Sequence, residues 1–198
     1  MSDKKRPYKM KRRAEREAQT RQRITESAVA LHGTVGPART SMKAVAEHAG
    51  VPRSTLYRHF PDEEALFGAC SAHWRSRHPR PDVARWARIS DPDERLRAAL
   101  GELFAYYRGA APMLDRLLRD EPAVPIVAEL MSGFHQLFPA ITELLMQGRG
   151  LRGKARDRTR AAIGHAISFR TYQQLTEEAA LDDDAAAELM RRLVAAAA

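Results

Sequence analysis

A tight turn between two short helices, in residues 41–60, limits the fold of this chain more than any other feature. Ser41 can cap a helix over 42–48, whose apolar residues share one face. Gly50 ends that helix, because glycine readily adopts the left-handed conformation of a helix C-terminus. Pro52, a favoured first helical residue, opens a third helix that ends near Phe60. Two helices joined so closely must pack against each other.

The rest of the chain also predicts helices, because strand signals are almost absent and Pro and Gly mark the breaks. Pro61 is expected to open a fourth helix, and Pro139 to kink or split a later one. Residues 77–95 are expected to hold a loop or a short helical piece. The other expected helices cover residues 14–31, 92–110, 112–120, 123–147, 154–179 and 184–196.

Positive charge is concentrated at the N-terminus. Residues 1–60 hold fourteen Lys and Arg against five acidic residues, a difference of +9. Since the whole chain carries +8, the remaining residues sum to −1. A basic N-terminal third on a nearly neutral body indicates a polyanion-binding end, although a basic tail that serves solubility is the simpler reading.

The spacing around the turn is that of a helix-turn-helix. Ala46 is small enough for the two helices to approach closely, and Val51, Leu56 and Phe60 can pack on the first helix. In this motif the second helix enters the major groove of DNA.

Residues 23–67 (RITESAVALHGTVGPARTSMKAVAEHAGVPRSTLYRHFPDEEALF) resemble the DNA-binding domain of the TetR family of bacterial transcriptional regulators. The tract AGVPRSTLYRHF is close to that family's signature. The resemblance implies an all-α chain: a basic flexible arm (1–18), a three-helix helix-turn-helix DNA-binding domain (19–70) and a helical effector-binding and dimerisation domain (71–198). It implies no cofactor. The expected partners are a palindromic double-stranded DNA operator, a small-molecule effector and a second copy of the chain.

The resemblance also implies roles for individual residues. Residues of the third helix are expected to reach base edges or phosphates: Arg53, Ser54, Thr55, Tyr57 and His59. Residues at the start of the second helix are expected to hold a phosphate: Thr40, Ser41 and Lys43. Ser54 stands where the family usually has Gly, and its side chain is expected to restrict how closely this helix approaches the bases. Glu63 stands where the family commonly has Lys, and its negative charge would repel a phosphate, so one backbone contact is in question.

Ten basic side chains fall within the first 23 residues, and we interpret them as sources of nonspecific attraction to DNA. The alternative is a solvated disordered tail. The ten are Lys4, Lys5, Arg6, Lys9, Lys11, Arg12, Arg13, Arg16, Arg21 and Arg23.

Apolar groups of the C-terminal body either line an effector cavity or form a core. The expected cavity residues are Trp74, Phe104, Tyr107, Met131, Phe134 and His135. The family forms its dimer through its last two helices, and the matching residues expected at that interface are Ile163, Ile167, Phe169, Leu189 and Leu193.

Other chemistry has little support in the sequence. Cys70 and His73 lack the further ligands of a metal site, and a single cysteine forms no internal disulfide. We find no phosphate-binding loop, nucleophile elbow or apolar carboxylate pair, so no enzyme is expected. Without an apolar leader or membrane span, a cytoplasmic protein is expected.

The main hypothesis is a dimeric regulator, more often a repressor, whose effector moves the two recognition helices through the fourth helix. One rival is a helical small-molecule binder or enzyme with a degenerate helix-turn-helix. Another is a nonspecific nucleic-acid binder that uses only the basic arm.

Overall fold

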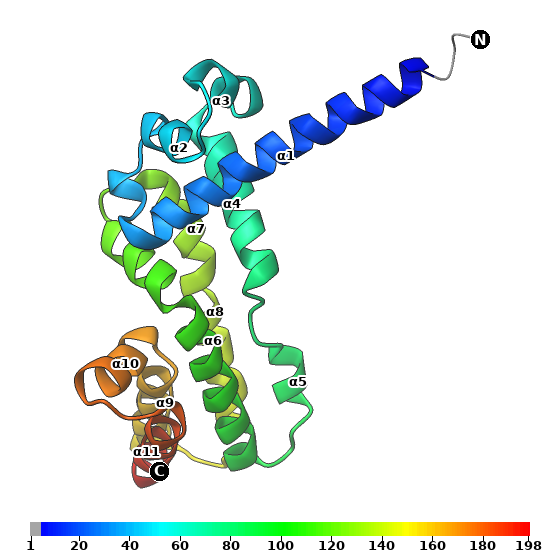
Figure 1. Ribbon diagram of the computed structural model, residues 1–198. Helices are drawn as coiled ribbons and strands as arrows, with labels where there is room; N and C mark the ends of the chain where they lie inside the picture. The colour runs from blue at the N-terminus through cyan, green and yellow to red at the C-terminus, as the bar shows by residue number, and fades with distance from the viewer. Residues whose placement is uncertain (1–4) are drawn as a thin grey trace. The chain divides into compact units, whose positions relative to one another are not determined.

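The computed structural model describes residues 5–198, apart from the side chains of residues 5–7 and 9, and within that range it is helical without strands (Figure 1). No helix in the described part is long and apolar enough to cross a membrane. In chain order the elements are α1 (Lys5–Thr34), η1 (Pro37–Arg39), α2 (Met42–His48), α3 (Arg53–His59), α4 (Glu63–Arg77), α5 (Val83–Ala87), α6 (Pro92–Asp120), α7 (Pro125–His135), α8 (Leu137–Met146), α9 (Gly153–Ala166), α10 (Phe169–Gln173), η2 (Gln174–Glu178) and α11 (Asp183–Ala196).

The region around the turn agrees with the sequence prediction. The Ser41 side chain accepts a hydrogen bond from the Ala44 backbone N–H at 3.1 Å and caps α2. Gly50 follows with φ +62°, the left-handed conformation expected there. Asp62 caps α4 through the Ala65 N–H at 2.7 Å. These signals act over three or four residues, which explains why the predicted boundaries are close to the observed ones.

The first helix begins earlier than the predicted residue 14, because α1 is helical from Lys5, and the role of this segment as a flexible arm stays a prediction. Its sequence is rich in Lys, Arg, Glu, Ala and Gln, which favour helices, and Arg13 and Glu17 form an i,i+4 pair at 3.4 Å. Residues 10–19 are all exposed, so this part of α1 is stabilised mainly by local interactions.

Helix α6 is continuous where two helices were predicted. Pro112 lies inside it and removes one backbone hydrogen bond, the one to the carbonyl of Arg108. Burial of Met113, Leu114 and Leu117 in the following turns compensates for this loss. The predicted break at Pro112 is therefore wrong.

Of two predictions about later helices, the structure confirms one and contradicts the other. The split expected near Pro139 is confirmed, because the chain breaks at Gln136 and places Pro139 in the first turn of α8, where no N–H is needed. The single helix over 154–179 is wrong. It stops at Ala166, and Ser168 starts α10 by accepting the Thr171 N–H at 3.1 Å.

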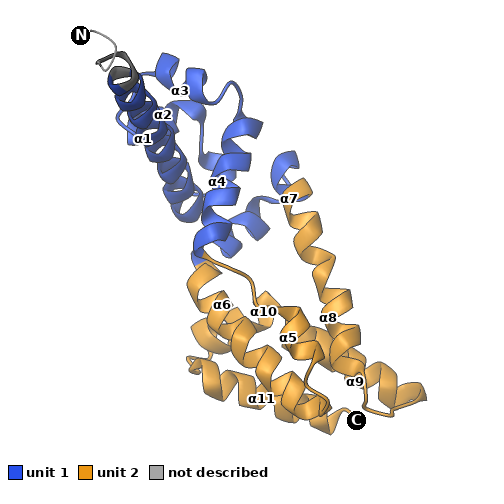
Figure 2. Ribbon diagram, turned by 90° about the vertical axis from the view of Figure 1, so that its right-hand side faces the viewer, with its two compact units in different colours: residues 1–77, 112–128 blue, residues 78–111, 129–198 orange. Residues whose placement is uncertain are grey.

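The chain divides into two compact units (Figure 2). The first contains residues up to Arg77 together with Pro112–Ala128, and its core includes Ile24, Leu56 and Phe60. The second contains His78–Ala111 and Glu129–Ala198, with a core built around Trp86, Phe104, Tyr107, Leu145, Ile163 and Ile167. The predicted functional boundary near residue 70 stays a prediction.

Candidate nucleic-acid interface and ligand cavity

Helix α3 is fixed to α1 by its apolar inner face and by one arginine. Leu56 and Phe60 are fully buried. Arg21 of α1 lies over the Phe60 ring, with 4.1 Å from Cζ to the ring centroid, and donates from Nη1 to the His59 carbonyl oxygen at 2.6 Å. Arg21 thus satisfies a C-terminal carbonyl of α3 and covers its last apolar side chain. From the sequence pattern alone Arg21 is only one of ten basic side chains near the N-terminus.

The opposite face of α3 is open to solvent. Arg53 and Ser54 are exposed at its start, and the Tyr57 side chain one turn later is 42% exposed. Thr55 and His59 are half-buried. Burial lowers the pKa of His59, and the positive charges of Arg58 and Arg21 lower it further, so its ring is neutral at pH 7.

The residues predicted at the start of α2 are close together in the sequence, and all three already have partners, Ser41 through the Ala44 N–H that it caps. The Thr40 hydroxyl donates to the Gly36 carbonyl at 2.8 Å. Lys43 is exposed and lies 3.7 Å from Glu47. Glu63 is exposed in the first turn of α4, where its negative charge interacts favourably with the positive end of the helix dipole.

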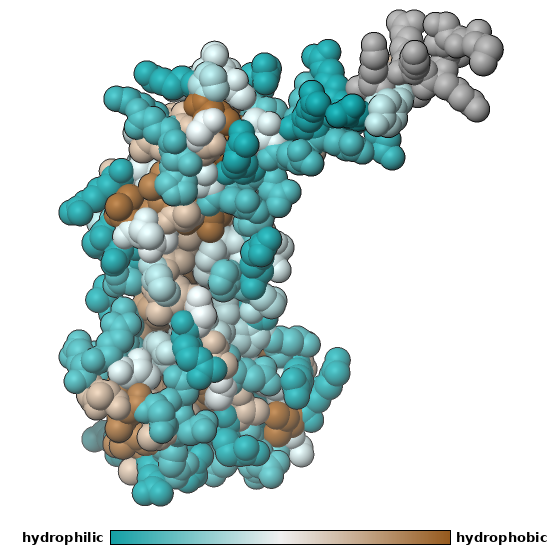
Figure 3. All heavy atoms as spheres, in the orientation of Figure 1, coloured by the Kyte–Doolittle hydropathy of each residue, from teal (hydrophilic) through white to brown (hydrophobic). Residues whose placement is uncertain are grey.

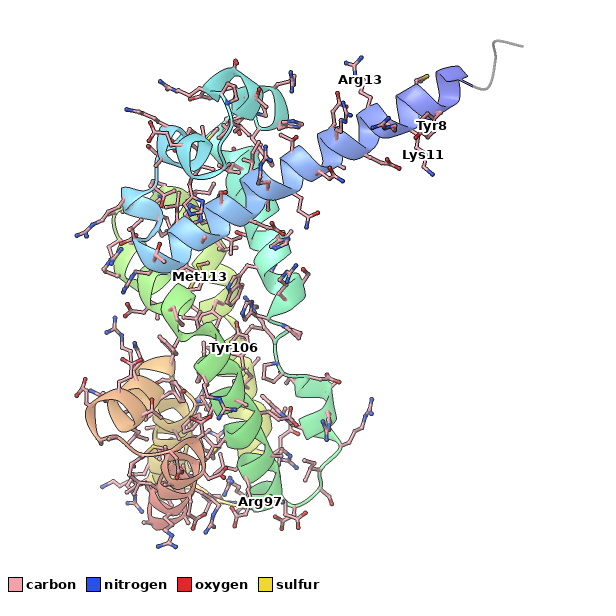
Figure 4. All side chains as sticks on the ribbon, viewed as in Figure 1. Tyr8, Lys11, Arg13, Arg97, Tyr106 and Met113 are labelled. Carbon is pink, nitrogen blue, oxygen red and sulfur yellow. The ribbon has the colours of Figure 1, made fainter. Side chains whose placement is uncertain are left out.

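A basic groove lies between the outer part of α1 and the end of α3. Its volume is about 660 Å³, and it is lined by Tyr8, Arg12, Arg13, Arg16, Glu17, Thr20, Arg58 and His59. Figure 3 shows hydrophilic side chains over the outer part of α1. Figure 4 shows the side chains of Tyr8, Lys11 and Arg13 projecting from this helix. Lys4 lies outside the described residues, as do the side chains of Lys5, Arg6 and Lys9.

Within the first unit, side chains in the last turns of α6 form hydrogen bonds with the backbone of the loop before α2. Asp120, 5% exposed, accepts the Ala38 N–H at 2.9 Å. Arg116 donates to the Thr34 carbonyl at 3.0 Å, and Arg119 donates to the Val35 carbonyl at 2.8 Å. We call Arg116, Arg119 and Asp120 the α6 clasp. Arg119 and the Ala38 N–H hold the pKa of Asp120 below its usual value, so its carboxylate stays charged.

The second unit contains an apolar cavity of about 210 Å³. Tyr107 and Phe134 are among its lining residues, which include nine others. They are Arg80, Pro81, Val83, Trp86, Leu103, Tyr106, Leu137, Phe138 and Ile141. Helical periodicity marked some of these positions as apolar, but nothing local shows which apolar faces leave a space between them.

The other predicted cavity residues lie elsewhere. Phe104 is buried in the core and packs edge-on against Tyr172, with ring centroids 5.2 Å apart. Met131 is buried without lining the cavity, and His135 is exposed. Trp74 is half-buried on α4 in the first unit.

Three of the predicted dimer residues are buried in the core of the second unit, and their place at a dimer interface stays a prediction. Ile163 and Ile167 are fully buried, and Phe169 packs against Tyr107 with ring centroids 5.4 Å apart. They are needed to fill the core of the second unit. Leu189 and Leu193 differ, because they lie on the outer face of α11 and are 38% and 51% exposed.

Cys70 is a packing residue in this structure. It is buried, its Sγ lies 3.5 Å from Nδ1 of His32, and burial raises the pKa of its thiol to about 12. The thiolate that would bind a metal or attack a substrate is therefore disfavoured at pH 7. Within the described residues no three His, Cys, Asp or Glu side chains form a group able to hold a metal ion.

A short helix, a glycine turn and a second short helix with an exposed cationic start define a helix-turn-helix DNA-binding domain. Residues 24–70 match the family model described as bacterial regulatory proteins, tetR family. The chain therefore carries the DNA-binding domain of the TetR family.

Similar proteins extend the likeness beyond that domain. An HTH-type transcriptional regulator of Mycobacterium tuberculosis is 27% identical over 136 residues, which span 65% of this chain and 62% of the relative. A TetR-like regulator from Rhodococcus sp. RHA1 aligns with a TM-score of 0.65 at 23% identity, over 88% of this chain and 93% of its own. A tetR-family regulator from Streptomyces coelicolor aligns with a TM-score of 0.57 at 21% identity, over 91% of this chain and 79% of its own. These structures share the fold of both units.

Proposed function

We propose that the chain is a non-enzymatic, dimeric transcriptional repressor that binds a palindromic operator and is released by a small molecule. The observation that carries this proposal is the open face of α3, with Arg53 at its start and the buried face held by Arg21. An arginine there can pair with a guanine in the major groove, and Tyr57 with a phosphate. A dimer on an operator that overlaps a promoter represses by excluding the polymerase.

Helix α6 supports a route for the response to the effector. Its residues Leu103, Tyr106 and Tyr107 line the cavity, and its last turn carries the α6 clasp. Tyr107 and Arg116 are nine positions apart in the sequence of the same helix. A ligand that shifts α6 would pull the loop before α2, in addition to any movement of α4. A coupling of about 1–3 kcal/mol would suffice for regulation.

The basic groove of α1 supports a second contact with DNA. Its arginines extend the positive surface beyond α3, and their side chains can track phosphates without reading bases. We assign it affinity and no specificity.

Footprinting on the promoter beside the chain's own gene tests the proposal. A protected palindrome supports a specific regulator, and uniform protection favours the nonspecific binder. Binding constants are then measured by fluorescence anisotropy at one salt concentration. Arg53→Ala should cost about 1–3 kcal/mol on the operator and relax one base position per half-site. Tyr57→Phe should weaken operator and scrambled DNA equally. If both variants match the parent on every DNA, α3 is not the binding surface.

A further inference from the structure

The lining of the cavity in the second unit is mainly apolar, and two of its four polar side chains already have hydrogen-bond partners. The Trp86 Nε1–H donates to Glu102 Oε2 at 3.0 Å. The Tyr107 hydroxyl donates to the Ile167 carbonyl at 2.7 Å. A ligand in the cavity therefore meets hydrocarbon on most sides, and these two polar groups have already made their hydrogen bonds.

Two polar groups in the lining remain available. Burial raises the pKa of Tyr106, and the positive charge of Arg80 opposes the shift, so the Tyr106 hydroxyl keeps a proton that it can donate to a ligand. Arg80 also lies over the Phe134 ring, with 5.5 Å from Cζ to the centroid. It is exposed, and within the described residues it pairs with no carboxylate.

The position of Arg80 is restrained by its own sequence. It stands between Pro79 and Pro81, whose rings fix their backbone φ angles. The contact with the Phe134 ring then holds the guanidinium beside the cavity, whose lining also includes Tyr106. It is also the only charged side chain in the cavity lining. A cation fixed next to an apolar space, without an anion of its own, complements a ligand with an apolar body and one negative group.

We propose that the cavity binds a small apolar carboxylate, with the carboxylate held by Arg80 and Tyr106 and the apolar part among Trp86, Leu103 and Ile141. A cavity of about 150 Å³ lined by aliphatic and aromatic residues holds benzene. The 210 Å³ available here therefore suits one substituted ring or a short acyl chain. This inference rests on the proposed function, because it gives the effector its chemical class.

Benzoate and benzamide form a matched pair of probes, since they have nearly the same shape and only benzoate is charged. Their dissociation constants are measured by isothermal titration calorimetry on the full chain and on Arg80→Gln. We expect the parent to bind benzoate about 10- to 100-fold more tightly than benzamide, and Arg80→Gln to lose that difference. Arg88→Gln, an exposed arginine outside the lining, should leave both constants unchanged.

Several outcomes would overturn the inference. They are equal affinity for the two probes, a preference for benzamide, or an unchanged benzoate constant in Arg80→Gln. Failure of benzoate, phenylacetate and hexanoate to bind up to about 10 mM would do the same, because that limit corresponds to less than 3 kcal/mol of binding free energy.

Fluorescence anisotropy with operator DNA distinguishes failure of this inference from failure of the proposed function. If benzoate binds through Arg80 but leaves the operator complex intact, the ligand class stands and the effector response fails. If the chain binds no operator with or without the acid, the proposed function fails whatever calorimetry shows.

Discussion

Acid should destabilise the first unit through His32. This residue lies near the end of α1, its side chain is 7% exposed, and its ring centroid is 5.3 Å from that of Phe67 on α4. Burial lowers the pKa of His32 from its usual 6.5 to about 4, although the negative charge of Asp120 opposes the shift. The folded unit therefore holds a neutral imidazole at a pH where the unfolded chain is protonated.

The size of the effect follows from that pKa difference. The stabilisation is fully present above pH 6.5, the unfolded value, and is lost as the pH falls from 6.5 towards 4. Each unit of pKa shift corresponds to about 1.4 kcal/mol, so His32 alone should remove about 3 kcal/mol of unfolding free energy between pH 7 and pH 4. That is a large part of the stability of a typical domain.

Urea unfolding at stepped pH values measures this loss. His32→Phe keeps a ring against Phe67 and has no proton to gain, so its unfolding free energy should fall by about 3 kcal/mol less than that of the parent over the same range. His48→Gln, at an exposed position of α2, serves as the control and should behave like the parent. Proton NMR of the His32 ring gives a second reading. If His32→Phe loses as much stability as the parent, or the ring titrates near pH 6.5, the reasoning is wrong.

Three further predictions concern assembly, the α6 clasp and the arm. Replacing Leu189 and Leu193 with Glu should give a folded monomer in sedimentation, because both are exposed on α11. Gly36→Ala should lower stability by about 1–3 kcal/mol in thermal unfolding, since Gly36 has φ +92° and a Cβ there would meet Arg119 and Asp120. Gly68→Ala, with open space around it, should not destabilise. Deleting residues 1–13 should flatten the salt dependence of DNA binding by about 0.9 in log–log slope per lost phosphate contact.

Each of these can fail clearly. A dimer that survives both charges on α11 would place the interface elsewhere. Equal melting temperatures for the parent and Gly36→Ala would remove the argument from backbone strain. An unchanged salt slope would show that the removed residues do not reach phosphates.

The accuracy of the sequence predictions follows the range of the interactions. The turn at Gly50 and the cap at Ser41 depend on neighbours within four residues, and both were predicted. The break before α10 also has a local signal, the Ser168 cap, which the apolar periodicity of the segment concealed. Helix α6 passes through Pro112 because of tertiary burial, which sequence patterns do not show.

The candidate sites also differ in whether local sequence or long-range packing determines them. The residues of α3 were predicted from a local motif, and of these Arg53, Ser54 and Tyr57 are exposed. The α6 clasp joins residues more than 80 positions apart, such as Ala38 and Asp120, so no local pattern could reveal it. The cavity likewise depends on how the helices of the second unit pack, which explains why no local pattern identifies its lining.

The α6 clasp also limits how such a chain can be recombined. A chimera that joins residues 1–77 to the body of another regulator would leave the backbone groups of Thr34, Val35 and Ala38 without the partners that RLLRD at 116–120 supplies. The exchangeable module is therefore discontinuous in sequence, and its second piece begins in the middle of a helix. Exchange of ligand-sensing bodies, in evolution or in a biosensor, should succeed when this five-residue tract is carried along with the DNA-binding helices.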